Sequence, residues 1–225
     1  QISNLRQSSV SRSRSDNGWR LARTRLESSD LSQLQSVRNF TGERSAQYWL
    51  TPFLGALVAG EAKTQAQVVA LLERIYNQLS LAQHSQKHAS FALLACHDFA
   101  MRRIDTVIDA LNEPNGTRFE HYWFQKLEYI LWRERSRFGF FDASKLAAYR
   151  ITSKNSVEHV HPQREEFGVE LAKVHLDSFG NLVLLSPGEN SSYSNQRVGK
   201  KREDFKGKPR YDSLKLAHIF SGKAE

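Results

Sequence analysis

Cysteine is almost absent from this sequence, which has one, Cys96, among 225 residues. One cysteine cannot form an internal disulfide and is too few for the cysteine pairs of a structural zinc site. A lone thiol also predicts a reducing compartment, by default the cytoplasm. No apolar run approaches the roughly 18–20 residues of a membrane span, and no secretory leader is visible. We therefore expect a cytoplasmic protein without a membrane segment.

Methionine is equally scarce, since the sequence contains Met101 and no other. The chain begins with Gln1, which is not a translation start, so we expect a piece of a longer protein, with a processed N-terminus as the alternative. Hydrophobic residues make up 40% and aromatic residues 11%, enough to build a core and to exclude wholesale disorder. The length suits one domain, or one domain with an appendage.

Positive charge is concentrated in two segments. The sequence has 32 Lys and Arg against 24 Asp and Glu, a net charge of +8. Residues 1–45 hold eight basic residues and four acids, residues 186–215 hold the same numbers, and the remainder has 16 of each sign. Two basic segments on a neutral body indicate a polyanion partner, most simply nucleic acid. Two solvated surface segments would give the same pattern.

The first 44 residues are rich in Ser, Arg and Gln and contain few large apolar side chains. This composition predicts an exposed basic arm or linker over residues 1–44, with a short helix around residues 30–37. Such an arm could follow a phosphate backbone. An interdomain tether is the simpler interpretation.

Residues 45–150 show the periodicity of amphipathic helices, and we expect a helical domain there. Apolar residues between positions 68 and 79 recur at the 3–4 residue spacing of one helix face. Residues 91–111 carry a similar pattern and read as one further helix. The sequence NEPNG at 112–116 then predicts a stop.

A third helix is expected after this stop. Thr117 and Glu120 have the spacing of a capping box, in which each side chain satisfies a backbone N–H of the other residue. The histidines of the helical region are interpreted as surface or core residues, because no acidic or thiol partner recurs at ligand spacing. These are His84, His88, His97 and His121.

Beyond residue 150 the pattern becomes strand, loop, strand, helix. Residues 156–162, SVEHVHP, alternate and include β-branched side chains, which predicts a short strand ended by Pro162. The run LVLL at 182–185 predicts a second, buried strand. Three residues then have the order of a helix N-terminus: Ser186, Pro187 and Glu189. The whole chain is therefore expected to be α+β.

Three residues of this module suit a metal ion and the activation of water. Glu158 and His159 lie on the first strand, and Asn190 lies near the first turn of the following helix. In a strand–strand–helix hairpin the first strand lies against that turn, so the two oxygen-bearing side chains could meet. Two oxygen ligands completed by water suit Mg²⁺ better than Zn²⁺. A neighbouring neutral histidine could take a proton from water during phosphodiester hydrolysis.

Three motifs in this order resemble the His-Asn-His nucleases of the ββα-metal class: VEHVHPQ, FGNLVLLSPGENSSYSN and a Lys-rich tail ending in YDSLKL. More specifically, they resemble the C-terminal nuclease domain of GmrSD-type modification-dependent restriction enzymes and of SspE-like anti-phage proteins. The segment KLEYILWRER is similar to the helix that precedes the nuclease motif in that group. The resemblance is specific over about 151–215, weaker over 45–150 and unsupported over 1–45.

The resemblance implies a role for each matching residue. Glu158 and Asn190 would be ligands of Mg²⁺ or Mn²⁺, and His159 would be the general base. Asn181 would brace the loop and orient the base, so the catalytic set is His159, Asn181 and Asn190. Because Asn190 stands where the third residue of the family name is His, this is a His-Asn-Asn variant. Further residues are expected near the DNA: His161, Asn195, Lys200, Lys201 and Arg202.

The resemblance as a whole implies a metal-dependent DNA endonuclease that serves as the effector of a bacterial restriction or anti-phage protein. It places the nuclease module with a basic C-terminal segment at 151–225. A ParB-like nucleotidase or sensor domain would precede this chain, which itself shows no Walker-type loop. Two alternatives remain open: a nucleic-acid-binding module without catalysis, and a helical interaction domain capped by residues 151–215.

Overall fold

A computed structural model of the chain describes residues 8–15, 18–25, 28–41, 47–82, 85–103, 105–164, 170–193 and 195–222. The fold is α+β, as expected, with helices predominating over two antiparallel two-stranded sheets in the described ranges. The first half contains β1 (Ser8–Ser15), β2 (Gly18–Arg25), α1 (Asp30–Asn39), α2 (Leu50–Val58), α3 (Gln65–Ala82), α4 (Gln86–Cys96) and α5 (Asp105–Asn112). The second half contains η3 (Gly116–Arg118), α6 (His121–Arg133), η4 (Arg135–Arg137), α7 (Ala143–Ala148), β3 (Ser156–His159), α8 (Lys173–Leu176), η5 (Phe179–Asn181), β4 (Leu182–Leu185), α9 (Pro187–Tyr193), α10 (Val198–Gly207) and α11 (Leu214–Ser221).

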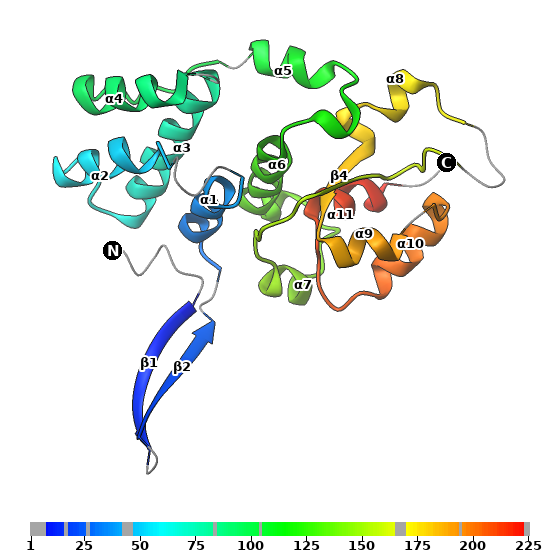
Figure 1. Ribbon diagram of the computed structural model, residues 1–225, viewed down its shortest axis with the longest axis horizontal. Helices are drawn as coiled ribbons and strands as arrows, with labels where there is room; N and C mark the ends of the chain where they lie inside the picture. The colour runs from blue at the N-terminus through cyan, green and yellow to red at the C-terminus, as the bar shows by residue number, and fades with distance from the viewer. Residues whose placement is uncertain are drawn as a thin grey trace.

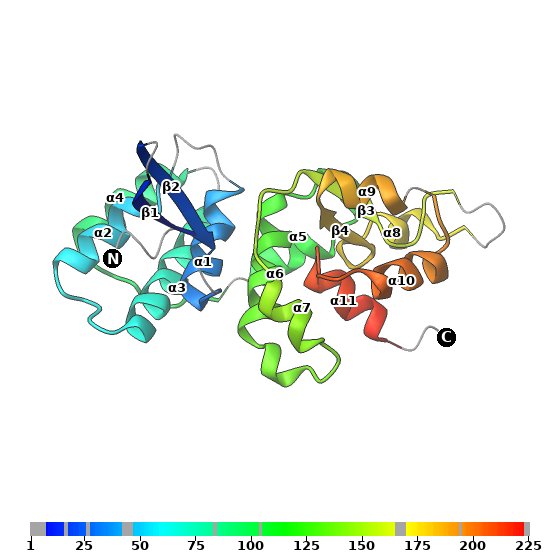
Figure 2. The same cartoon turned by 90° about the horizontal axis from the view of Figure 1, so that it is seen from below.

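Two groups of elements are visible side by side in Figure 2. The β1–β2 hairpin and helices α1 to α4 form one group, and α5 to α11 with the β3–β4 pair form the other (Figures 1 and 2). Helix α1 packs against α6 and joins the two groups. None of the helices in the described ranges is both long and apolar enough to cross a bilayer.

The helical periodicity predicts α3 correctly, and residues 91–111 incorrectly. The apolar face of α3 is buried at Leu71, Leu72, Ile75 and Leu79, which explains why the local pattern predicts this helix. Residues 91–111 form parts of two helices, because α4 ends at a left-handed residue, His97, with a φ of 52°. A left-handed residue ends the hydrogen-bond ladder of an α-helix, so the apolar pattern beyond it belongs to α5.

The predicted capping box at Thr117 and Glu120 is wrong. Thr117 lies inside η3, and α6 begins later, at His121. Glu120 occupies the N-cap position of α6, and its side chain makes no capping hydrogen bond. The turn starts at Gly116, whose φ of +57° suits glycine.

The first 44 residues contain more structure than an arm or linker. The short helix expected around residues 30–37 is confirmed as α1. Its Leu31, Leu34 and Val37 are buried in the main core, so residues 28–41 do not form an exposed arm. Residues 8–15 and 18–25 pair as two antiparallel strands that composition alone does not predict, because cross-strand pairing depends on register rather than on amino-acid content.

The expected strand, strand and helix are present after residue 155. β3 pairs antiparallel with β4, with Glu158 opposite Val183 and His159 opposite Leu182. β4 is buried on both faces, as the LVLL run predicts. Val183 and Leu185 pack with α9, α10 and α11, whereas Leu182 and Leu184 pack against Phe124 of α6. The β-pair is therefore held between α6 and the C-terminal helices. Helix α9 begins at Pro187, as expected.

Candidate functional site

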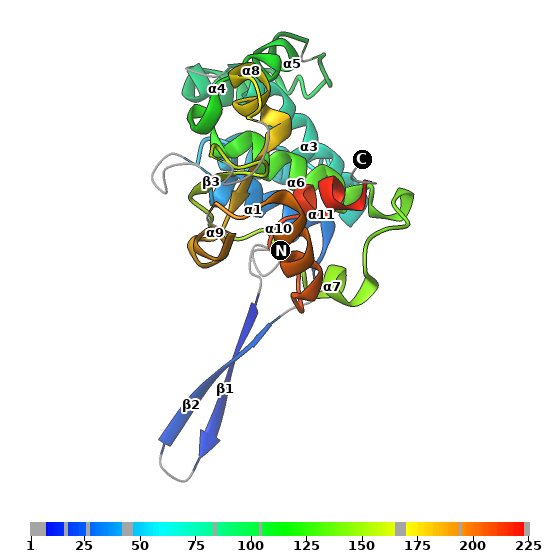
Figure 3. The same ribbon diagram turned by 90° about the vertical axis from the view of Figure 1, so that its right-hand side faces the viewer.

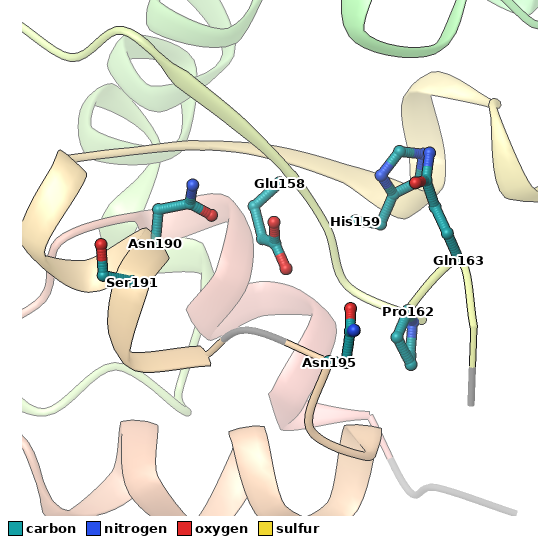
Figure 4. A pocket seen from close by; sticks show the side chains of 7 residues that line it. All are labelled: Glu158, His159, Pro162, Gln163, Asn190, Ser191 and Asn195. Atoms are coloured by element: carbon teal, nitrogen blue, oxygen red, sulfur yellow. The ribbon is translucent and has the colours of Figure 1, made fainter. Parts of the chain in front are cut away.

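A polar pocket of about 270 Å³ opens between the end of β3 and helix α9. Figure 4 shows the side chains that line it. They come from the strand end, from the segment after it and from the region of α9: Glu158, His159, Pro162, Gln163, Asn190, Ser191 and Asn195. Residues more than thirty positions apart meet here because β3 lies against α9. Four residues singled out in the sequence are among them.

Glu158 and Asn190 bring two oxygen-bearing side chains to the same pocket. In Figure 4 the side chain of Asn190 extends toward the carboxylate of Glu158. The amide Nδ2 of Asn190 donates to Ser156 Oγ at 2.8 Å, which leaves the amide oxygen turned to the other side. That Oδ1 atom is buried and has no hydrogen-bond partner. A buried oxygen without a donor is costly, and a cation would satisfy it.

Lys201 contacts a residue of this pocket from helix α10 without lining the pocket itself. Its side chain is only 2% exposed, and its Nζ donates to Glu158 Oε1 at 2.8 Å and to the backbone oxygen of His159 at 2.7 Å. Lys201 was expected on a DNA-holding surface, but it instead ties α10 to the end of β3. It holds one carboxylate oxygen of Glu158 and leaves Oε2 for another partner.

His159 is buried, with 6% of its surface exposed, and it has an acidic neighbour. Its Nε2 lies 3.4 Å from Oδ1 of Asp177, just after α8. If Nε2–H donates to this carboxylate, Nδ1 carries the lone pair of the neutral ring. Sequence reasoning missed Asp177, because nothing in its local sequence distinguishes it from any other loop carboxylate.

The backbone of Asp177 is held in place by the turn at Gly116. The N–H of Gly116 donates to the backbone oxygen of Asp177 at 2.9 Å. A Cβ atom at Gly116 would stand 3.1 Å from Asp177 Oδ1, so this position has no room for a larger residue without movement. The glycine that sequence analysis treated only as a helix stop therefore also supports the carboxylate beside His159.

Asn181 braces the segment that follows β3. Its Oδ1 accepts the N–H of His161 at 2.8 Å, and its Nδ2 donates to the backbone oxygens of Leu176 and His161 at 2.9 and 3.3 Å. Its own backbone oxygen accepts from Val160. These contacts fix the backbone on either side of Val160. The carboxylate of Asp177, rather than the amide of Asn181, contacts the ring of His159.

The other residues expected near DNA are dispersed. Asn195 lines the pocket and is exposed. Lys200 is exposed and pairs with Asp204 at 2.7 Å on the same helix. Arg202 donates to the backbone oxygen of Gly222, and Nδ1 of His161 lies 3.2 Å from the oxygen of Pro162. The structure thus places Asn195 at the pocket, and Lys200 on the outer surface of α10.

The donors at the pocket suit a hard cation. Within the described residues, no three His, Cys, Asp or Glu side chains form a cluster that could hold a metal ion. The polar groups that line the pocket instead include one carboxylate, Glu158, and the amide side chain of Asn190 with its unpaired oxygen. Mg²⁺ and Mn²⁺ accept such oxygens and keep several waters of their own. The residues present therefore fit an ion of this kind.

One family matches the chain over its second half. The model of the C-terminal domain of GmrSD restriction endonucleases matches residues 105–224. The chain belongs to this family. The match contains the whole pocket, and it begins at α5, within the segment assigned above to the helical domain. No curated protein and no solved structure matches the chain. The GmrSD domain is that of a restriction endonuclease, which makes DNA its substrate class.

Proposed function

We propose that this GmrSD domain is an Mg²⁺- or Mn²⁺-dependent DNA endonuclease of the His-Asn-His, ββα-metal type. We further propose that it is the cytoplasmic effector of a bacterial defence protein whose ParB-like sensor domain lies outside this chain. The observation that carries the proposal is the convergence of Glu158, His159 and Asn190 on one polar pocket at the end of β3. The unpaired oxygen of Asn190 supports it.

Each residue of the site has a separate role in the proposed hydrolysis. Glu158 and Asn190 would hold the divalent ion, which offsets the negative charge that develops on the phosphodiester. His159 takes a proton from the attacking water as its oxygen bonds to phosphorus. The ester bond to one sugar oxygen then breaks, and that oxygen is protonated by solvent. Asp177 keeps the ring of His159 in place and faces the positive charge that the ring acquires.

One contact favours a second function, binding of DNA without cleavage. The ammonium group of Lys201 already neutralises Glu158 at 2.8 Å, so the carboxylate has a cation even without a metal ion. A pocket whose carboxylate is neutralised in this way would no longer repel a phosphate. The two functions differ in their need for a divalent ion, because binding without cleavage requires none.

The test is the nicking of supercoiled plasmid DNA by the 225-residue chain. We expect conversion to the open-circular form in Mg²⁺ or Mn²⁺ and none in excess chelator. His159→Ala should lower the rate by at least about 100-fold, since a positioned general base contributes about 10²–10⁴-fold. The thermal unfolding midpoint reports whether the variant is folded.

His175→Ala is the matched control, because it removes an exposed histidine of α8 that does not line the pocket. Its nicking rate should equal that of the unchanged chain. Nicking that persists in chelator would contradict the role of the ion. Full activity in a folded His159→Ala protein would remove this histidine from the mechanism.

A further inference from the structure

The β1–β2 hairpin projects away from the remainder of the molecule (Figures 1 and 3). The side chains described on it are all exposed, including the large apolar ones of Trp19 and Leu21, at 59% and 75%. The two strands contain five arginines and no acidic residue. The hairpin lies outside the region that matches the GmrSD domain. Neither core packing nor the proposed catalysis accounts for its composition.

The register of the hairpin sorts its side chains onto two different faces. Directly paired residues of antiparallel strands share a face, and Arg12 pairs with Leu21 while Arg14 pairs with Trp19. These four residues therefore lie together on one face. The opposite face carries the pairs Ser11–Ala22 and Ser13–Arg20. One face is thus basic and aromatic, and the other consists mostly of small side chains.

The arginines of the first face are available to a partner. The guanidinium of Arg12 lies over the ring of Trp19, 3.8 Å from its centroid, which forms a flat cationic surface. Across the described residues, Arg12 and Arg14 make no ion pair with a carboxylate. Their charge is therefore not neutralised within the described protein. A partner for this face should be an extended anion that also tolerates a flat aromatic ring.

We propose that the hairpin is a second DNA contact, which binds duplex DNA through the face formed by Arg12, Arg14, Trp19 and Leu21. A two-stranded β-ribbon fits the major groove, because its strands lie about 5 Å apart and the groove is about 12 Å wide. Strands of eight residues extend for about 27 Å, enough to carry these side chains into the groove. Self-association through this face would bring like charges together.

This inference takes DNA as the substrate from the proposed function, but it does not depend on the catalytic roles of the pocket. The two can therefore fail separately. Binding is measured with the otherwise intact His159→Ala chain, so that cleavage does not interfere. Absence of metal-dependent nicking by the unchanged chain, with normal hairpin-dependent binding, would count against the pocket. Metal-dependent nicking without any hairpin-dependent binding would count against the hairpin.

The experiment compares two faces of the same hairpin. Binding of a labelled duplex is followed by fluorescence anisotropy at several salt concentrations. Arg12→Ser with Arg14→Ser should weaken binding at least about tenfold and reduce the salt slope by up to about 2, because each phosphate contact contributes about 0.9 to the slope. Trp19→Ala should weaken binding without changing the slope. Arg20→Ser, which removes an arginine of the other face, should have less effect than Arg14→Ser.

Several results would overturn the proposal. One is unchanged duplex affinity in the double arginine variant. Another is an equal loss for Arg20→Ser and Arg14→Ser, which would indicate only general electrostatic attraction. A third is binding to vesicles of anionic lipid that depends on the hairpin as strongly as duplex binding does. A fourth is a change of molecular mass in solution that accompanies the loss of binding. The thermal midpoint should stay constant in every variant, because the substituted side chains are exposed.

Discussion

At the scale of single residues, the contact between Asp177 and His159 is the most informative feature of the pocket. A buried histidine can adopt either tautomer, and a carboxylate at one ring nitrogen selects the one in which that nitrogen carries the proton. Asp177 holds this position, 3.4 Å from Nε2. It does not line the pocket, so it acts on the reaction through His159.

Asp177→Asn tests this positioning role. The amide keeps the size of the side chain but can present a donor to Nε2, which favours the wrong tautomer. We expect the nicking rate at saturating DNA to fall about 10–100-fold, the range found for residues that orient a reacting group, while DNA affinity and the thermal midpoint stay unchanged. Asp177→Glu should recover part of the rate. A purely structural role would lower the midpoint and leave the rate of the folded protein intact.

At the scale of elements, helix α11 is fastened to α6 by one buried carboxylate. Glu128 is 2% exposed, and four donors from two other segments reach it. They are Ser213 Oγ at 2.5 Å, Leu214 N at 2.6 Å, Tyr149 Oη at 2.8 Å and Lys215 N at 3.2 Å. The first N–H groups of a helix have no partner within it and attract negative charge. Glu128 supplies that charge and thereby anchors the wall behind β4.

Glu128→Gln should therefore destabilise the protein. The amide has the same shape but loses the charge and turns an N–H group toward donors. Hydrogen bonds to a charged group contribute about 1.5–3 kcal/mol each, so we expect the free energy of unfolding in urea to fall by about 2–4 kcal/mol. Glu134→Gln is the control, because Glu134 ends α6 in a largely exposed pair with Arg137 and should change stability by under about 1 kcal/mol. Similar losses in both variants would contradict the anchoring role.

At the scale of the whole molecule, Lys215 joins α11 to η5 and to β4, the strand that pairs with β3. Its ammonium group donates to the backbone oxygens of Phe179 and Leu182 and lies 3.8 Å from the ring centroid of Phe179. Burial lowers the pKa of Lys215 from its ordinary 10.5 to about 7, although Glu128 acts in the opposite direction. The stability of the entire fold is thus linked to the protonation of one side chain.

The sign of this linkage predicts a pH dependence. Between pH 7 and 10 the unfolded chain keeps a proton on this lysine that the folded chain has released. The free energy of unfolding should therefore rise across this range, with a slope of up to about 1.4 kcal/mol per pH unit. Below pH 7 both states are protonated and this contribution is constant. Urea unfolding at pH 7.5, 8.5 and 9.5 measures the slope. Lys215→Met should abolish it, and an equal slope in that variant would exclude the lysine as its origin.

Much of the local structure could be predicted from the sequence. The periodicity of α3, the alternation before Pro162 and the order of Ser186 and Pro187 each depend on neighbours within one or two turns. The same reasoning failed at His97, because a left-handed backbone is not encoded in apolar spacing. It also failed at the strands 8–15 and 18–25, because pairing of Arg14 with Trp19 depends on register.

The sequence by itself determined the strand–strand–helix order of the module and the membership of Glu158, His159 and Asn190 in one set of candidate residues. Only the tertiary structure decided which groups surround them: Asp177 contacts the ring of His159, and Lys201 pairs with Glu158. The physical reason is distance along the chain. Patterns of side chains encode contacts between near neighbours, whereas a lysine that lies 43 positions after its carboxylate reaches it only because α6 and α11 pack around β4 and bring α10 against β3.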